Sequence, residues 1–260
     1  MRKIIDITAL SIAVCILIMV LFLPSPVLSF KCYRGDSVGC AQLGRDKLSR
    51  GDYEGAKPAL AKACEAGEKD SCFDLGALYD GEGNATQAGV FYDAACDKNV
   101  AVACHKLGNL YQRGRLSRDF VAAAQRYARA CDLGYAKSCH NAGVVYFTGG
   151  FGLAADPAKA VSFFERGCDG GLVDSCYNAG VAYDKGLGAP QDRDQAEKLY
   201  TKSCELGYGD ACNNLGYLYV SKGDLRGFSK GLGWVKKGCD AGNKKSCQLY
   251  EFMKNEILKK

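Results

Sequence analysis

The sequence predicts an all-α protein, a right-handed αα-solenoid of short repeats stapled by disulfides, and three observations support this fold class. Fourteen of the fifteen cysteines form seven pairs with a single spacing, C-x7-C, and successive first cysteines lie 32 to 37 residues apart. Such a period is typical of arrays in which each repeat is one supersecondary unit. Between the cysteine pairs, apolar residues recur at helical spacing, and no segment alternates as a strand would.

The cysteine pairs predict a disulfide framework rather than a metal site. Zinc ligands usually come as C-x2-C or C-x4-C, and only His105 and His140 offer imidazole in this chain. An even cysteine count with constant spacing is typical of exported, disulfide-rich proteins. We therefore expect no metal and no cofactor, and seven disulfides. The expected pairs are Cys32/Cys40, Cys64/Cys72, Cys96/Cys104, Cys131/Cys139, Cys168/Cys176, Cys204/Cys212 and Cys239/Cys247.

The first 29 residues differ from the rest of the chain. Arg2 and Lys3 precede an apolar stretch over residues 7–23, and tolerated residues stand before a cleavage point at Ser29. This pattern predicts a secretory signal peptide over residues 1–29 and a secreted or periplasmic mature protein. As a helix the stretch is about 25 Å long, slightly shorter than a bilayer core of roughly 30 Å. An uncleaved N-terminal anchor is the alternative to a signal peptide, and it would be the one expected contact with a membrane. Cleavage after Ser29 removes Cys15.

The cysteine pairs also predict where the helices begin and end. Each first cysteine is expected to end one helix, called helix B, and each second cysteine to lie in the first turn of the next, called helix A. Three residues after each first cysteine stands a residue that readily adopts the left-handed conformation, which predicts a helix C-cap. These residues are Gly35, Gly67, Asn99, Gly134, Gly171, Gly207 and Gly242. The pattern therefore predicts a solenoid of six helix pairs over residues 30–250. It also predicts a C-terminal capping helix over residues 246–260.

A second glycine column lies four residues after the second cysteine. It consists of Gly44, Gly76, Gly108, Gly143, Gly180 and Gly216. A glycine inside a helix costs roughly 1 kcal/mol relative to alanine, so its repetition needs a structural reason. We predict that helix A approaches helix B closely at these positions.

A polar column, two residues after each second cysteine, is the candidate binding surface. It consists of Gln42, Asp74, Lys106, Asn141, Asn178 and Asn214. Helix A usually lines the concave face of such arrays, and amides both donate and accept hydrogen bonds to a peptide backbone. We predict Asp74, Lys106, Asn141, Asn178 and Asn214 as ligand-binding residues, with a merely solvated polar face as the alternative.

The two histidines stand one residue before members of this column. His105 and His140 occupy equivalent places one repeat apart, which is too far for them to share a metal, so we predict that they are structural histidines.

The charge distribution excludes one class of partner. The formal net charge is +5, and lysine and arginine are scattered through every repeat without a basic block. A nucleic-acid-binding protein usually carries a concentrated basic patch. We therefore expect no nucleic acid as a partner. We also expect the protein to be a monomer.

These columns resemble the Sel1-like repeat, a relative of the tetratricopeptide repeat. The unit from Ser138 to Gly171 follows the repeat pattern at Gly143, Tyr146, Gly149, Asp156, Lys159, Ala160, Phe164 and Gly171. Cysteine at both ends of every unit resembles the Helicobacter cysteine-rich protein family of secreted Sel1-like proteins. The resemblance covers about residues 32–250 and implies a TPR-like solenoid. It also implies β-lactam binding or weak β-lactamase activity, as that family is classed.

The residues themselves do not carry a hydrolase motif. The sequence contains no S-x-x-K, S-D-N or K-T-G, and two histidines are too few for a metallo-β-lactamase. The one G-x-S-x-G match, Gly227 to Gly231, falls in an expected helix B instead of a strand–turn–helix. We expect an exported scaffold that binds a peptide, a protein or a peptidoglycan fragment on its concave face. A β-lactam hydrolase is the alternative, and the catalytic residues it would need, like the ligand itself, stay unknown.

Overall fold

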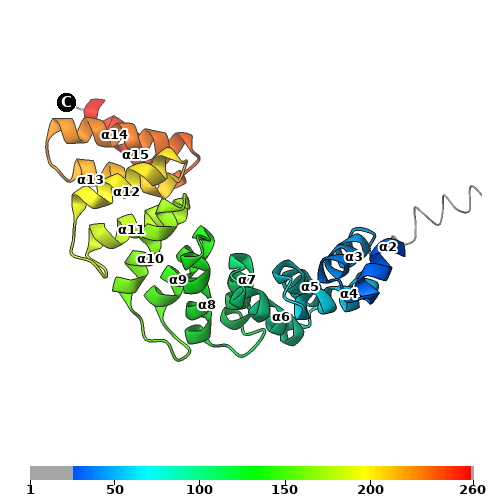
Figure 1. The fold of residues 1–260 in the computed structure, drawn as a ribbon. Helices are drawn as coiled ribbons and strands as arrows, with labels where there is room; N and C mark the ends of the chain where they lie inside the picture. Colours follow the sequence, from blue (N-terminus) through cyan, green and yellow to red (C-terminus); the bar gives the residue numbers. More distant parts are fainter. Residues whose placement is uncertain (1–25, 259–260) are drawn as a thin grey trace, which may run out of the picture. The chain divides into compact units, whose positions relative to one another are not determined.

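The protein is an array of short helices in a computed structural model, which describes residues 26–258 (Figure 1). Fourteen helices lie within this range, and it contains no strand. No helix in the range is long and apolar enough to cross a membrane. The predicted all-α repeat architecture is confirmed. The predicted signal peptide lies mostly outside the described residues, and its last four residues belong to the first described helix.

The helices follow one another with short connections. They are α2 (Pro26–Tyr33), α3 (Ser37–Ser49), α4 (Tyr53–Glu65), α5 (Lys69–Gly81), α6 (Ala85–Asp97), α7 (Ala101–Gln112), α8 (Phe120–Asp132), α9 (Ala136–Thr148), α10 (Pro157–Asp169), α11 (Val173–Lys185), α12 (Arg193–Glu205), α13 (Gly209–Val220), α14 (Leu225–Asp240) and α15 (Lys244–Leu258). Helix A of each pair is odd-numbered from α3 to α13, and helix B is even-numbered from α4 to α14. The terminal helix α15 starts two residues before the predicted capping segment.

The chain divides into two compact units, residues 1–103 and residues 104–260. In the first unit, α3 packs on α4, α4 on α5 and α5 on α6. Its core includes the buried side chains of Ala56, Leu60 and Leu75. The helix α2, which the sequence did not predict, packs on α3 and places Leu28 against the buried Cys32 and its neighbours.

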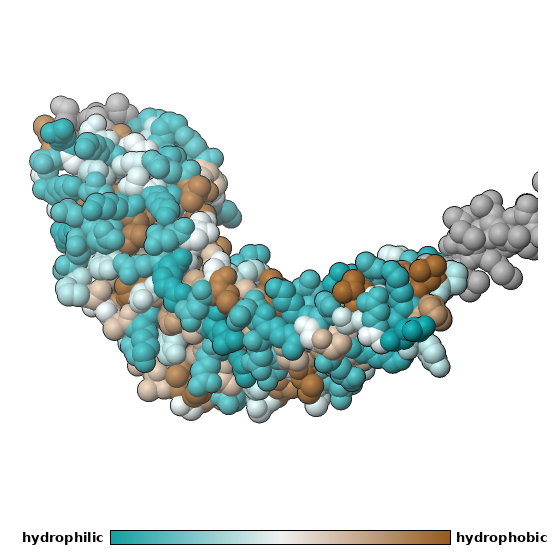
Figure 2. Space-filling model, viewed as in Figure 1, coloured by the Kyte–Doolittle hydropathy of each residue, from teal (hydrophilic) through white to brown (hydrophobic). Residues whose placement is uncertain are grey.

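In the second unit, each helix from α8 to α15 packs on the next one along the chain, and Figure 1 shows α9 to α14 stacked side by side. Buried tyrosines, alanines and cysteines form its core, as in the cluster around Tyr200, Leu215 and Cys204. On the face seen in Figure 2, hydrophilic residues cover most of this unit, and hydrophobic residues appear only in local patches. A local apolar patch on such a surface is therefore a candidate contact site.

The predicted C-caps are confirmed. All seven residues of the cap column have a positive φ, between 63° at Asn99 and 103° at Gly67. The left-handed conformation costs a residue with a side chain more than it costs glycine, which explains the composition of the column. The N-terminal ends of the helix B segments, α4 to α14, are capped by Asp or Asn side chains. In α10, Asp156 accepts a hydrogen bond from the Lys159 amide at 3.0 Å, with Pro157 as the first helical residue.

The predicted close approach of helix A to helix B is also confirmed. A Cβ atom built on any of the six mid-helix glycines would lie less than 3.0 Å from a large side chain of the following helix B. Those side chains are Leu60, Tyr92, Tyr127, Phe164, Tyr200 and Val235. All six are buried and stand four residues before a first cysteine. The glycine therefore makes room for one bulky residue in each repeat.

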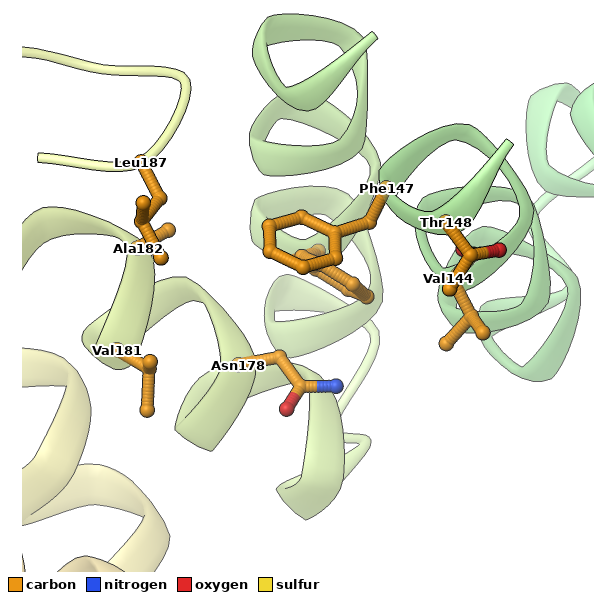
Figure 3. Close-up of a pocket in the computed structure, with 8 residues that line it drawn as sticks. Val144, Phe147, Thr148, Asn178, Val181, Ala182 and Leu187 are labelled. Carbon is orange, nitrogen blue, oxygen red and sulfur yellow. The ribbon is translucent and has the colours of Figure 1, made fainter. Parts of the chain in front are cut away.

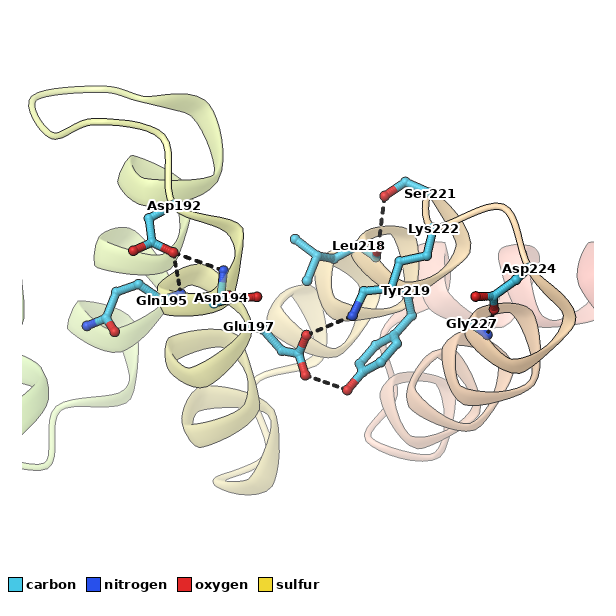
Figure 4. A network of polar contacts seen from close by, with 10 residues as sticks. All are labelled: Asp192, Asp194, Gln195, Glu197, Leu218, Tyr219, Ser221, Lys222, Asp224 and Gly227. Atoms are coloured by element: carbon cyan, nitrogen blue, oxygen red, sulfur yellow. Dashed lines mark hydrogen bonds and ion pairs between the residues drawn. The ribbon is translucent and has the colours of Figure 1, made fainter.

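Polar contacts connect neighbouring repeats at the surface, as Figure 4 shows for α12 and α13. Glu197 on α12 accepts hydrogen bonds from the Tyr219 hydroxyl and, at 3.2 Å, from the Lys222 ammonium group. The hydrogen bond to Glu197, followed by burial, raises the pKa of Tyr219 to about 12. This network fixes the end of α13 against α12.

Candidate binding site on the helix A face

The cysteine ladder is structural. Six disulfides join the end of one helix to the start of the next, at Cys32–Cys40, Cys64–Cys72, Cys131–Cys139, Cys168–Cys176, Cys204–Cys212 and Cys239–Cys247. Cys96 and Cys104 are disulfide-bonded as well. Twelve of these cysteines are buried, and Cys239 and Cys247 are half-buried. All fourteen are disulfide-bonded, so none of them presents a free thiol to solvent. Their role is to hold the helix ends that position the polar column.

The polar column does not form a uniform ladder. In the first unit, Gln42 is exposed, and Asp74 accepts a hydrogen bond from Arg45 Nε at 3.2 Å. In the second unit, Lys106 is half-buried. The three asparagines that follow on α9, α11 and α13 are half-buried too, but they differ in their partners.

Two of the three asparagines bind a tyrosine of the preceding helix B. Asn141 hydrogen-bonds with the hydroxyl of Tyr127, and Asn214 Nδ2 donates to the hydroxyl of Tyr200 at 3.3 Å. Both tyrosines are fully buried, and burial raises the pKa of Tyr127 to about 12. A buried hydroxyl needs a hydrogen-bond partner, so these amides are already used within the protein.

Asn178 is the exception because its tyrosine is missing. The equivalent residue on the preceding helix B is Phe164, which has no hydroxyl. Among the described residues, Asn178 makes no side-chain hydrogen bond. Its amide therefore keeps its full capacity to donate and accept.

The free amide of Asn178 lines an apolar cavity between α9 and α11 with a volume of about 160 Å³ (Figure 3). We call it the apolar cavity. Its other lining residues are Val144, Phe147, Thr148, Phe164, Val181, Ala182 and Leu187. Figure 3 shows Leu187 and Ala182 on one side, Val144 and Thr148 on the other, and Phe147 and Asn178 between them. Apolar walls with a single orienting polar group are typical of binding sites.

The two histidines have structural partners within the second unit. His105 Nδ1 lies 2.8 Å from Ser138 Oγ, and His140 Nδ1 lies 3.1 Å from Ser175 Oγ, in each case on the next helix A. Burial lowers the pKa of His105 to about 4 and also lowers the pKa of His140. Each histidine is therefore a neutral link between repeats at neutral pH. Within residues 26–258, no three histidine, cysteine, aspartate or glutamate side chains converge as metal ligands do.

The serine of the G-x-S-x-G match lies on a helix, as expected. Ser229 is exposed in α14, between Gly227 and Gly231, and both glycines pack closely against α13. A hydrolase serine of this motif sits on a strained turn after a strand. The glycines here have a packing role.

Of the residues that line the apolar cavity, only Asn178 was predicted as a site residue. Val144 and Phe147 lie at different positions of α9 and Leu187 lies in the loop after α11, so no single sequence column contains them. One sequence signal was available. Phe164 stands in a column that has tyrosine in the second, third and fifth units. A missing hydroxyl opposite an asparagine marks an amide without its usual partner.

Comparison with known proteins supports the repeat assignment. The Sel1 repeat model matches residues 101–135, 136–172, 173–208 and 209–243, which together make up more than half of the chain. Each match begins at or next to the first residue of a helix A, from α7 to α13. No curated protein matches the sequence as a relative.

Solved structures with this fold come from several bacteria. A protective antigen of uropathogenic Escherichia coli is 23% identical, with a TM-score of 0.71 over 86% of this chain and 50% of that one. This chain thus spans half the length of the antigen. A Sel1 repeat protein from Oxalobacter formigenes is 24% identical, with a TM-score of 0.64 over 79% of this chain and 87% of that one.

Helicobacter pylori cysteine rich protein B is 27% identical over 49% of this chain and 91% of that one, with a TM-score of 0.39. The repeat matches, the cap column and the helix pairs agree with one another along the second unit. This chain belongs to the Sel1 repeat family.

Proposed function

We propose that this protein is an interaction scaffold that binds an extended peptide segment of a partner protein on the helix A face of residues 104–260. Sel1 repeat proteins generally mediate protein–protein interactions. The observation that carries the proposal is the free amide of Asn178 beside the apolar cavity. An extended peptide offers both of the groups that this arrangement lacks, a backbone amide for Asn178 and a side chain for the cavity.

The exposed rim of the cavity supports the same proposal. Phe147 is 39% exposed and Leu187 is 41% exposed, although both are large and apolar. Covering them would remove apolar surface from water, at about 25 cal/mol for each Å². A partner segment lying across α9 and α11 would cover both residues and the Asn178 amide together.

We further propose that the protein works in an oxidising compartment, secreted or periplasmic, after export by its N-terminal segment. The support is the disulfide bonding of all fourteen cysteines between residues 32 and 247. Such bonds persist outside the reducing cytosol. Mass spectrometry of the mature protein without reductant tests this: free thiols at several pairs would contradict it, and the N-terminal residue would show whether residues 1–29 are removed.

The binding proposal is tested by nuclear magnetic resonance. The oxidised chain, labelled with ¹⁵N, is titrated with a mixed pool of short peptides. We expect amide shifts to concentrate on α9, α11 and α13 and to weaken in the Asn178→Ala variant. Shifts confined to helix B, or no shifts, would contradict the proposal. Chromogenic cephalosporin and muropeptide titrations run in parallel, and turnover of the cephalosporin would favour the hydrolase alternative.

A further inference from the structure

A second cavity lies on the other side of α11, between α11 and α13, and differs in charge from the first. Its volume is about 340 Å³. Its lining residues are Asp184, Lys185, Arg193, Asn214, Tyr217, Leu218 and Ser221. We call it the basic cavity. Both cavities contain one asparagine of the polar column, Asn178 in the apolar cavity and Asn214 in the basic cavity, so they stand in successive repeats on the same face.

The basic cavity contains an arginine without a partner. Lys185 Nζ lies 2.9 Å from Asp184 Oδ2, so these two charges compensate each other. Arg193 is exposed and makes no ion pair within the described residues. The adjacent Asp192 uses its carboxylate to cap α12, accepting hydrogen bonds from the amides of Asp194 and Gln195. The guanidinium of Arg193 can therefore pair with an incoming carboxylate through two parallel hydrogen bonds.

The size of the apolar cavity limits what it accepts. Pockets for drug-sized molecules usually measure about 300–1,000 Å³, so a cavity of about 160 Å³ fits a single bulky side chain. The hydrogen-bonding group beside it is an amide, which matches a peptide backbone. Phe147 and Leu187 at the rim would cover the inserted side chain.

The spacing of the two cavities sets the spacing of the ligand groups. Packed helices lie about 8–10 Å apart, and the two cavities flank one helix, α11. An extended peptide advances about 3.3 Å for each residue, so about three residues span this distance.

We propose, building on the proposed function, that the ligand is an extended peptide with a bulky apolar residue and an acidic residue about three positions apart. The apolar side chain enters the apolar cavity, the acidic side chain pairs with Arg193, and the amide of Asn178 binds the peptide backbone beside the apolar residue. The ligand class is thus an apolar–acidic motif within a partner protein.

Selection from random peptides tests the motif. The full-length oxidised chain is used to enrich a phage-displayed library of random nonapeptides, and the enriched sequences are read. We expect leucine, methionine or phenylalanine to co-occur with aspartate or glutamate about three positions away. Enrichment of peptides without this pairing would overturn the motif and leave the proposed function standing. Failure to enrich any peptide would overturn both.

Variants of the chain then assign each half of the motif to its cavity. For a selected peptide, Arg193→Gln should weaken binding about threefold to fivefold, which is the size expected for an exposed ion pair, and the loss should shrink at high salt. Arg226→Gln removes an exposed arginine from α14 and is the matched control, with no expected change. Replacing the acidic residue of the peptide by its amide should lower the affinity for the wild-type protein by the same factor. The same replacement should leave the affinity for the Arg193→Gln variant unchanged. Equal losses with both chains would overturn the assignment to Arg193.

The apolar half is tested in the same way. Phe147→Ser with Leu187→Ser should weaken binding at least tenfold and remove the apolar preference from a repeated selection, while the acidic preference remains. Asn178→Ala should weaken binding about twofold to tenfold for all selected peptides, as the loss of one hydrogen bond would. An unchanged apolar preference in the double variant would overturn the proposal. Occupation of this face by a second copy, seen as a concentration-dependent mass in sedimentation and lost with the same variants, would overturn it as well.

Discussion

A missing hydroxyl group distinguishes the repeat that contains the apolar cavity. In the repeats on either side, Tyr127 and Tyr200 bind Asn141 and Asn214. At the equivalent place, Phe164 leaves Asn178 free. The repeats therefore serve as controls for one another, because at this position tyrosine and phenylalanine differ by one oxygen atom. The candidate site follows from this local exception within a regular array.

The first prediction adds the missing hydroxyl. Phe164→Tyr should place an oxygen near Asn178, satisfy its amide and reduce the space in the apolar cavity. We expect the free energy of unfolding in urea to stay level or rise by about 1 kcal/mol, the net worth of a hydrogen bond. We expect peptide binding to weaken by about tenfold. The reverse change, Tyr127→Phe, should lower the free energy of unfolding by about 1 kcal/mol, since the half-buried amides of Asn109, Gln112 and Asn141 lose the hydroxyl they bind. Unchanged peptide binding by Phe164→Tyr would contradict this account.

The second prediction concerns pH and His105. Burial, followed by the charges of Lys106, Lys137 and Arg113, lowers the pKa of this histidine to about 4 in the folded protein. The unfolded chain has a histidine pKa near 6.5. Between these values the unfolded chain binds a proton that the folded chain does not, so acid favours unfolding. The free energy of unfolding should fall as the pH drops from about 7 to about 4.

A variant separates His105 from other acid effects. His105→Phe is suitable because Phe73 occupies the equivalent position in the first unit. Urea unfolding at pH 7 and at pH 5 should show a smaller difference for the variant than for the wild type. Part of the difference should remain, because His140 is buried in the same way and its pKa is lowered too. The same pH difference in both proteins would exclude His105 as a contributor.

At the scale of the helix, each repeat is held by a small residue facing a large one. Gly143 on α9 lies so close to α10 that an added Cβ would stand 2.6 Å from the ring of Phe164. The C-terminal end of α10 also approaches its neighbour closely through small residues, since Gly167 packs against the buried Ser175 of α11. The distance between two helices is therefore set by residues that lack bulk, and a single methyl group is enough to disturb it.

The third prediction compares two glycines in helices. Gly143→Ala should lower the free energy of unfolding by about 1–3 kcal/mol, because overpacking outweighs the gain of up to about 1 kcal/mol in helix propensity. Gly233→Ala in α14 is the matched control, since no atom lies within 4 Å of its added Cβ. We expect that variant to gain up to about 1 kcal/mol. Thermal or urea unfolding measures both, and a stabilised Gly143→Ala would show that the helices can move apart at low cost.

The helices were predictable because their signals are local and recur six or seven times along the chain. A cysteine pair, a left-handed cap residue and a mid-helix glycine each report on a few neighbouring residues, and the helix bounds agree with them. The polar column was predicted as one binding surface, with a solvated polar face as the alternative, and the structure shows that its members differ in their partners. The hydroxyl that binds Asn141 belongs to Tyr127 on another helix, and such a contact is not visible within one sequence column. The apolar cavity was not predictable because residues of α9, α10 and α11 line it together. The helix α2 was not predicted because its first four residues fall in the segment interpreted as a signal peptide.

At the scale of the whole molecule, the disulfides act within two compact units, in which the helices from α2 to α6 and from α8 to α15 pack mainly on their neighbours along the chain. The stability of such an array is close to a sum of repeat and interface terms, so an internal defect interrupts the coupling between the segments on either side. Each bridge here closes a loop of eight residues, which gives about 2–3 kcal/mol by the loop-entropy argument. The position of a bridge in the array should therefore matter as much as its strength.

The last prediction compares an internal bridge with a terminal one. Replacing both Cys131 and Cys139 by serine removes a bridge between α8 and α9, with structure on both sides. Replacing Cys239 and Cys247 in the same way frees only the terminal helix α15. We expect the internal variant to unfold in urea with a broader transition and a smaller slope, because the segments on either side no longer unfold together. The terminal variant should keep a sharp transition and show faster hydrogen exchange in α15 alone. Equally sharp transitions in the two variants would mean that the packing of α9 against α8 and α10 couples the repeats without the bridge.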